Sequence, residues 1–274
     1  MPQCISPNTI RVGKSLITAS CGKCNFCLQN RRCDWSFRLQ QELKNSDSAW
    51  FFTMTYDQEN QPLVEIDDQH YGTLDKRDLQ LFFKRLRKAN GKGKSIKYYA
   101  VGEYGSDTFR PHYHAIVFNV KPSALVKASR IWDKGFLSVG NCQPASIHYV
   151  AKYVLNSHDN WKPLANPFAL ISQGIGKSYL TTNGYQHKNS LQNFVVNDSG
   201  KKQRIPRYFK TKIFSRKQTE SLTKTAIREN DLLYQASLSD LSNEYSSKSR
   251  ELELRNINAH EKIKNKNPLQ TNKL

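Results

Sequence analysis

Long hydrophobic runs are absent from this sequence of 274 residues. It has no stretch of about 18 apolar residues, so we expect no segment that spans a membrane. Residues 1–18 also lack the long apolar core of a secretory signal. We therefore expect the protein to stay in a reducing cytoplasm. Its six cysteines would then be thiols or metal ligands rather than disulfides.

Acidic residues are scarce as well. The chain has 23 aspartate and glutamate residues against 42 lysine and arginine residues, which gives a formal net charge of +19. Such an excess favours a polyanionic partner, because each phosphate that a basic side chain neutralises releases a counterion. Aromatic residues make up 11% of the chain and offer faces on which bases stack. Together these features predict a nucleic-acid-binding protein rather than a merely soluble basic one.

Two familiar catalytic patterns are incomplete. The segment Gly174-Ile-Gly-Lys-Ser178 resembles the end of a phosphate-binding loop, but Ile171 stands where that pattern requires its first glycine. We also expect no hydrophobic strand to lead into this segment. A His-x-His pair in the chain lacks the aspartate of the metallo-hydrolase pattern, because residue 116 is isoleucine. We therefore expect neither ATP binding nor metallo-hydrolase chemistry.

Hydrophobic periodicity along the chain predicts an α+β fold. The predicted strands cover residues 50–56, 95–101, 112–118 and 135–139, and the predicted helices cover residues 28–44, 75–88, 122–133 and 145–155. Residues 102–111 are expected to form a loop, and residues from about 157 to 200 are expected to be loop-rich. This order predicts a mainly antiparallel sheet with flanking helices.

Three regions differ in composition. Residues 1–34 are a Cys-rich head, residues 35–214 hold the predicted strands and helices, and residues 215–274 are a polar, helix-prone or flexible tail. The tail carries 11 basic and 8 acidic residues, so it accounts for only +3 of the net charge of +19. We therefore expect the DNA-binding surface on residues 1–214.

A histidine pair and a glutamate form the first candidate site. His112 and His114 flank Tyr113 in a predicted strand, so the alternation of a strand places both imidazoles on one face. Glu103 lies nine residues before His112. Two imidazoles and one carboxylate leave open positions on a divalent metal ion for water and phosphate oxygens. We predict Mg²⁺ or Mn²⁺ here, where it would polarise a scissile phosphodiester.

Two tyrosines form the second part of this pattern. Tyr149 and Tyr153 are four residues apart in a predicted helix, so both hydroxyls lie on one side. Lys152 lies between them and can contact a phosphate as a point charge. A tyrosine hydroxyl is a competent nucleophile when positive charge stabilises its phenolate. Taken alone, such a pair is more often part of a core, so the prediction depends on the histidines and tyrosines occurring together.

The cysteines of the head have the spacing of a metal site. Cys21, Cys24 and Cys27 follow one another at intervals of three residues. We predict a structural Zn²⁺ with four thiolate ligands, namely Cys4, Cys21, Cys24 and Cys27. Cys33 in place of Cys4, an iron–sulfur cluster and free thiols are the alternatives.

Several segments resemble a known family. Arg110-Pro-His-Tyr-His-Ala-Ile-Val-Phe118 resembles the His-hydrophobic-His motif of HUH endonucleases, and Tyr149-Val-Ala-Lys-Tyr-Val154 resembles the two-tyrosine motif of phage rolling-circle initiators. The chain is similar to replication initiators of the gokushovirus branch of the Microviridae. This similarity covers roughly residues 1–214 and includes the segments Cys-Gly-Lys-Cys, Phe-Phe-Thr-Met-Thr-Tyr-Asp, Gly-Glu-Tyr-Gly and Arg-Ile-Pro-Arg-Tyr.

The resemblance implies a viral, origin-specific and metal-dependent nicking endonuclease. Cleavage would leave a 5′-phosphotyrosine and a free 3′-OH, and the two tyrosines would alternate as strands are cut and rejoined in rolling-circle replication. The implied fold has the histidine pair on a central strand and the tyrosine helix packed beside it. The implied partners are single-stranded and duplex origin DNA with a host helicase and DNA polymerase, in the host bacterial cytoplasm.

Two other functions fit part of the pattern. One is a plasmid or transposon nickase of the HUH type, although relaxases usually place the nucleophile before the histidine pair and both tyrosines here follow it. The other is a non-catalytic, zinc-containing DNA-binding protein, which has no need of paired hydroxyls beside a histidine pair. The viral replication initiator is therefore the predicted function.

Overall fold

The computed structural model describes residues 4, 6–12, 15–105, 108–153, 161–197 and 200–239. The chain divides into two compact units, residues 28–178 and residues 1–27 with 179–274. The end of the helix predicted over 145–155 and residues 240–274 of the predicted tail lie outside the described residues. None of the described helices is long and apolar enough to cross a membrane.

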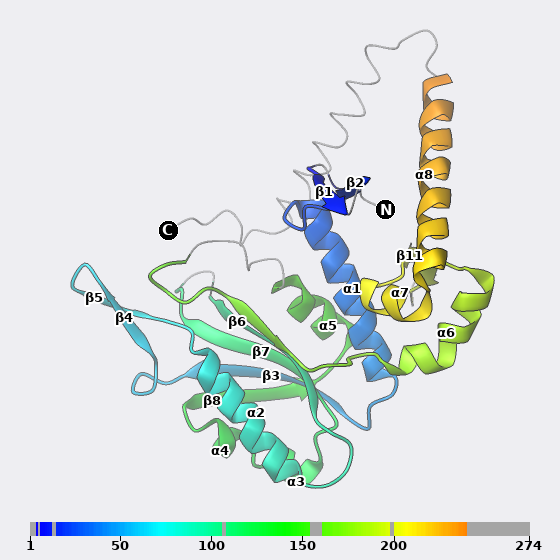
Figure 1. The fold of residues 1–274 in the computed structure, drawn as a ribbon. Helices are drawn as coiled ribbons and strands as arrows, with labels where there is room; N and C mark the ends of the chain where they lie inside the picture. Colours follow the sequence, from blue (N-terminus) through cyan, green and yellow to red (C-terminus); the bar gives the residue numbers. More distant parts are fainter. Residues whose placement is uncertain are drawn as a thin grey trace. The chain divides into compact units, whose positions relative to one another are not determined.

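A five-stranded antiparallel sheet is the centre of the unit formed by residues 28–178 (Figure 1). Its strands run in the order β8-β3-β7-β6-β9. They are β3 (Ala49–Tyr56), β6 (Lys97–Tyr104), β7 (Pro111–Phe118), β8 (Gly135–Asn141) and β9 (Phe168–Ile171). The middle strand, β7, carries both histidines of the predicted metal site. The predicted α+β class with a mainly antiparallel sheet is confirmed.

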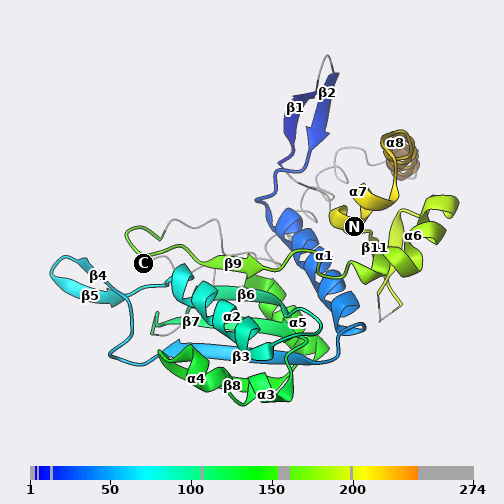
Figure 2. The same ribbon diagram turned by 60° about the horizontal axis from the view of Figure 1, so that its bottom comes forward.

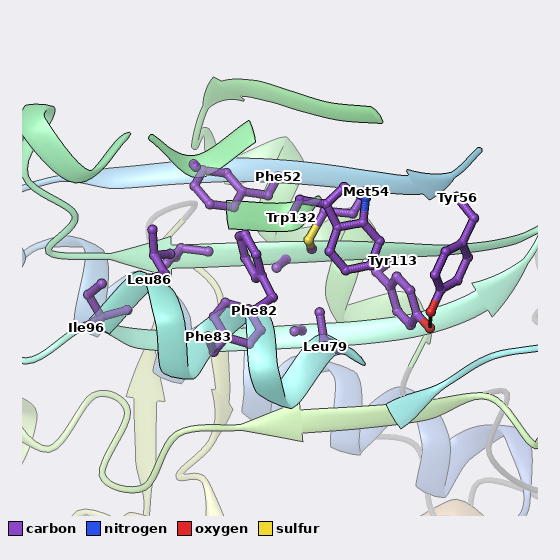
Figure 3. Close-up of a cluster of buried hydrophobic side chains, with 14 of the residues drawn as sticks. Phe52, Met54, Tyr56, Leu79, Phe82, Phe83, Leu86, Ile96, Tyr113 and Trp132 are labelled. Atoms are coloured by element: carbon purple, nitrogen blue, oxygen red, sulfur yellow. Dashed lines mark hydrogen bonds between the residues drawn. The ribbon is translucent and has the colours of Figure 1, made fainter. Parts of the chain in front are cut away.

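One face of this sheet is covered by α2 (Lys76–Asn90), α3 (Pro122–Leu125) and α4 (Ala128–Trp132) (Figure 2). The carboxylate of Asp75 accepts hydrogen bonds from the backbone N–H groups of Arg77 and Asp78, so α2 begins at Lys76. Figure 3 shows the core beneath the helices, where α2 contributes Leu79, Phe82, Phe83 and Leu86. Burying each of these side chains contributes about 1.5–3 kcal/mol.

The other face of the sheet packs against residues 28–43 of α1 (Asn25–Leu43) and against α5 (Pro144–Lys152). Ile147 and Val150 of α5 are buried against Ile116 and Phe118 of β7. Because side chains alternate along a strand, the even-numbered residues of β7 face α5 and the odd-numbered ones face α2. His112 and His114 therefore share the face that carries the tyrosine helix.

Two boundaries near the site differ from the prediction. The strand predicted over 95–101 extends to Tyr104, because residues 101–104 are buried in the sheet. Glu103 consequently lies inside β6 rather than in a loop. The helix predicted over 122–133 is divided into α3 and α4.

The prediction that residues 157–200 are loop-rich is wrong. They contain β9, α6 (Ser178–Ser190) and β10 (Phe194–Val196). Strand β9 ends at Ile171, so a strand does precede the Gly174–Ser178 segment, although the required glycine is still missing. Because the sequence of α6 is mostly polar, its hydrophobic pattern did not predict a helix. Its buried residues are Tyr179 and His187, and the Tyr179 hydroxyl lies 2.7 Å from His187 Nε2.

The second unit contains short strands and helices. Strands β1 (Asn8–Val12) and β2 (Ser15–Ala19) form one antiparallel hairpin, and β10 pairs with β11 (Lys202–Arg204). Helix α7 (Arg207–Ile213) contributes Phe209, whose ring lies 5.0 Å from that of Tyr179. Helix α8 (Arg216–Ser239) agrees with the helix-prone character expected from residue 215 onward. A further hairpin, β4 (Leu63–Ile66) with β5 (Gln69–Gly72), belongs to the unit of residues 28–178.

Candidate active site

Two paired strands, β6 and β7, bring together the histidine pair and the glutamate. The sheet register pairs His112 of β7 with Glu103 of β6, and His114 of β7 with Thr53 of β3. The Nε2 atoms of both histidines lie 3.1 Å from the same oxygen, Glu103 Oε1. The three ligand atoms are close enough together to hold one metal ion.

Both imidazoles are held at their other ring nitrogen. His112 Nδ1 lies 3.0 Å from the carbonyl oxygen of Arg110, and His114 Nδ1 lies 3.0 Å from Thr53 Oγ1. A carbonyl oxygen only accepts, so Nδ1 of His112 donates and Nε2 of the neutral ring keeps its lone pair for a metal. Such bonds fix the tautomer and the orientation of metal-binding imidazoles.

Burying the charged Glu103 carboxylate costs free energy unless a positive charge lies beside it. The Glu103 side chain is only 5% exposed and faces two imidazoles, and no ion pair joins it to a lysine or arginine among the residues that the structure describes. Burial opposes the charged form of His112, but hydrogen bonds to Glu103 and to the Arg110 carbonyl outweigh it and raise the pKa of this histidine. A buried carboxylate in this setting favours a positive charge beside it, which a proton or a metal cation can supply.

Helix α5 places the two tyrosines against His114. The Tyr149 hydroxyl lies 3.4 Å from His114 Nε2, and the tyrosine is 42% exposed. Tyr153, the residue that directly follows α5, is half-buried, and its ring stacks on that of His114 at a centroid distance of 6.0 Å. The two tyrosine rings are 5.0 Å apart. The structure thus brings both predicted nucleophiles to the histidine pair but does not make them equivalent.

The surrounding protein raises the pKa of both tyrosine hydroxyls and so makes them harder to ionise. Burial raises the pKa of Tyr149, and a hydrogen bond to Tyr153 offsets part of this rise. Burial raises the pKa of Tyr153 further, because its hydrogen bond to Tyr149 and the charge of Glu103 act in the same direction. A cation beside the hydroxyls would favour the phenolate.

Lys152 occupies the last position of α5 and is half-buried. Within the described parts of the chain, no ion pair joins its amine to a carboxylate. Its position next to Tyr153 is compatible with the predicted phosphate contact, which stays a prediction.

Two residues of β3 complete the site and were missed in the sequence. Besides Thr53, Phe51 contacts the cluster: its ring stacks on His114 at a centroid distance of 5.5 Å and meets Tyr149 edge-on at 6.1 Å. Both residues lie in a strand that was predicted, but only the pairing of β3 with β7 shows which residue they contact.

Comparisons with known proteins match this part of the chain. A family model described as replication-associated protein ORF2/G2P matches residues 49–158, the stretch that holds every described residue of this site. Replication-associated protein ORF2 of Spiroplasma virus 4 is 32% identical over 217 residues, and VP4 of Bdellovibrio phage phiMH2K is 28% identical over 219 residues. ORF4 of Chlamydia phage 1 is 31% identical over 157 residues, which are 49% of this chain and 37% of that protein.

The chain is similar to microvirus-type replication-associated proteins, and these matches support a rolling-circle replication initiator. The similarity seen in the motifs is therefore confirmed at the level of the family. For the Spiroplasma and Bdellovibrio virus proteins, the match covers 69% of this chain and 65% of the relative's own length.

The cysteines form a second group of candidate ligands. Their sulfur atoms all lie within 4.8 Å of one another, and the group consists of Cys4, Cys21, Cys24 and Cys27. Cys33 is not a member, and its sulfur lies 3.9 Å from Gln29 Nε2. The structure thus assembles the four cysteines favoured from the sequence, while the metal itself stays a prediction.

Two of these thiols, Cys21 and Cys27, differ in acidity. Hydrogen bonds from the backbone N–H groups of Cys24 and Lys23 lower the pKa of Cys21 to about 6. Burial raises the pKa of Cys27 to about 12. Cys21 is therefore the thiol more ready to ionise.

Proposed function

We propose that this protein starts genome replication by nicking one strand of origin DNA through a covalent tyrosine–DNA bond. The observation that carries the proposal is the contact of a nucleophile with a metal-ligand group, in which the Tyr149 hydroxyl lies 3.4 Å from His114 Nε2. A packing role for the tyrosines would not require a hydroxyl at the same nitrogen of His114 that lies 3.1 Å from Glu103 Oε1.

Glu103, His112 and His114 would hold the divalent metal. These residues offer one oxygen and two nitrogens and leave other coordination positions open. The mixed donor set suits Mn²⁺ better than Mg²⁺, which prefers oxygen ligands. When bound, the ion would act as a Lewis acid on the scissile phosphate.

The tyrosines would perform two exchanges of phosphate ester. A tyrosine oxygen attacks phosphorus, a new P–O bond to the tyrosine forms, and the bond from phosphorus to the 3′ oxygen breaks. The phenolic proton goes to solvent, and the departing 3′ oxygen takes up a proton. Because one phosphate ester replaces another, the phosphotyrosine bond can later be exchanged back, and the strand can be rejoined. Lys152 would contact a non-bridging phosphate oxygen.

The differences between the tyrosines suggest an order of attack. Tyr149 is the more exposed and has its hydroxyl at the metal-ligand group, so we assign it the first cut. Tyr153, half-buried beside it, would serve the second exchange, when Tyr149 already carries DNA.

DNA binding would rest on the basic excess of the chain. The net charge of +19 favours phosphate contacts along single-stranded and duplex origin DNA. A host helicase and a host DNA polymerase would complete the replication machinery, since the proposed reaction supplies only a nick and a 3′-OH.

The proposal is tested with the full chain and single-stranded origin oligonucleotides labelled at either end. With Mn²⁺ or Mg²⁺, we expect a detergent-resistant adduct that carries the 3′ part of the oligonucleotide, together with a free 3′-OH on the other part. A non-catalytic binding protein would instead give a shifted band that disappears on denaturation. Equal cleavage in excess EDTA, or cleavage without an adduct, would contradict the proposal.

A further inference from the structure

The cysteine group stands apart from the proposed nicking chemistry and has the geometry of a metal site. We propose that it binds one structural zinc ion, which anchors the β1–β2 hairpin to the first turn of α1. The ligands are Cys4, Cys21, Cys24 and Cys27. This inference does not depend on the proposed function, because it concerns different residues and a different kind of site.

The spacing of the sulfur atoms fits a tetrahedral zinc ion. Zinc–thiolate bonds are about 2.3 Å long, so the sulfurs at the corners of a tetrahedron are separated by about 3.8 Å. The sulfurs of Cys21 and Cys27 are 3.9 Å apart, and so are those of Cys4 and Cys24. A disulfide requires about 2.0 Å between sulfurs, so these pairs are spaced for a shared ion rather than for bonds to each other.

Backbone N–H groups point at two of these sulfurs. Cys21 Sγ lies 3.3 Å from the backbone nitrogen of Cys24 and 3.4 Å from that of Lys23, and Cys4 Sγ lies 3.3 Å from the backbone nitrogen of Cys21. The turn that aims them requires Gly22, whose φ of +74° is unfavourable for residues with a side chain. N–H donors stabilise negative charge on sulfur, which metal binding requires.

The donor set indicates a structural rather than a catalytic ion. Four thiolates fill a tetrahedral shell and leave no position for water or substrate. Soft sulfur ligands select zinc or iron over Mg²⁺ and Mn²⁺. The cysteine group therefore differs in both geometry and metal preference from the group formed by Glu103, His112 and His114.

The side chains described in the β1–β2 hairpin are largely exposed. Its strands pair from Asn8 with Ala19 to Val12 with Ser15, but Ile10 is 43% exposed and Leu16 is 67% exposed. An isolated two-stranded hairpin is marginally stable in water. Cys4 precedes β1 and Cys21 follows β2, so an ion bound by both closes the base of the hairpin. Cys27, in the first turn of α1, ties that base to the helix.

Metal analysis of the full chain tests the ligand assignment. A background that carries His112→Ala and His114→Ala removes the other group, and we expect about one zinc ion per chain to remain. Adding Cys24→Ser should remove this zinc, whereas Cys33→Ser should retain it, because Cys33 lies outside the group. Cobalt in place of zinc should give the thiolate charge-transfer band and the visible bands of a tetrahedral site. Zinc lost equally in both serine variants, or iron with acid-labile sulfide instead of zinc, would overturn the assignment.

Hydrogen exchange of the unmutated chain tests the anchoring role and does not depend on whether a variant folds. We expect that a zinc chelator increases exchange in residues 8–19 and in the first turn of α1, while α2 in the other unit serves as the internal control. The four cysteines should also become open to alkylation only after chelation. Unchanged exchange in the hairpin on complete removal of zinc, or full alkylation before chelation, would contradict the proposal.

Discussion

The two groups of candidate metal ligands are assembled in opposite ways. The cysteines lie within 24 residues of sequence and are gathered by a hairpin and one turn, so their spacing favoured this group, with Cys33 in place of Cys4 as the alternative. The other group depends on the pairing of β6 with β7, and Thr53 of the neighbouring strand β3 contacts His114 across 61 residues of sequence. Ligands that lie close together in the sequence can thus be recognised from their spacing. Ligands that come from different strands of a sheet can be recognised only when the pairing of the strands is known.

The two groups also differ in how many coordination positions they would leave open on a bound metal ion. Four thiolates complete a coordination shell, while two imidazoles and a carboxylate leave room for a phosphate. Beside the open group lie Tyr149 and Tyr153, the two proposed nucleophiles. Chemistry and stability should therefore respond to different substitutions.

The largest expected effect is that of His112→Ala combined with His114→Ala. Removing both imidazoles removes the Lewis acid, which contributes several kcal/mol, so single-turnover nicking should fall on the order of 1,000-fold or more. The zinc content of the cysteine group should not change. The control is His148→Ala, an exposed histidine of α5, which should nick normally. Equal losses in both variants would show that the histidine pair has no special role.

The next effect separates the two tyrosines. Tyr149→Phe should slow the first cut by on the order of 100-fold, because Tyr153 must then attack from a less favourable position. Tyr153→Phe should leave the first cut nearly unchanged and impair the release of a closed circle. Single-turnover cleavage and circle formation are measured on the same origin DNA. A slower first cut in Tyr153→Phe than in Tyr149→Phe would reverse the assigned order.

A smaller effect is expected from the residue behind His114. Thr53→Val removes the hydroxyl that lies 3.0 Å from His114 Nδ1 while keeping the shape of the side chain. The Mn²⁺ concentration for half-maximal nicking should rise by about 10–100-fold, as is typical when a metal-binding imidazole loses the group that orients it. Thr53→Ser, which keeps the hydroxyl, should restore most of the affinity. A valine variant with unchanged metal dependence would show that this contact is incidental.

The smallest effect on nicking is expected on the other face of β7. The Tyr113 hydroxyl lies 2.8 Å from that of Tyr56 and bonds to the backbone of Asp75 (Figure 3 shows both tyrosines in the core). Tyr113→Phe should lower the free energy of unfolding by about 1–3 kcal/mol, because buried partners lose their bonds. Nicking at a temperature where the protein is folded should be unchanged. Denaturant unfolding and nicking assays on the same preparation check both statements.

Patterns with a fixed local period were predictable from the sequence. The alternation of a strand puts His112 and His114 on one face, and the period of a helix does the same for Tyr149 and Tyr153. Glu103 was placed by its separation from His112, although the strand that carries it was predicted too short.

Other features depend on contacts that no local pattern encodes. Thr53 and Phe51 became part of the site through the pairing of β3 with β7. Strand β9 is only four residues long, and α6 is polar, so both were hidden in a segment predicted as loop. The domain limits at residues 34 and 214 stay predictions, as do the roles of the site residues.

The central claim is that a tyrosine of α5 becomes covalently linked to DNA, and peptide mapping of a trapped adduct tests it most directly. The full chain is incubated with Mn²⁺ and a single-stranded origin oligonucleotide, digested with protease and nuclease, and analysed by mass spectrometry. We predict a nucleotide joined through its 5′ phosphate to the peptide that contains Tyr149, with Tyr153 modified in the Tyr149→Phe variant. An adduct on any residue outside this pair, or an adduct that persists when both are phenylalanine, would contradict the account.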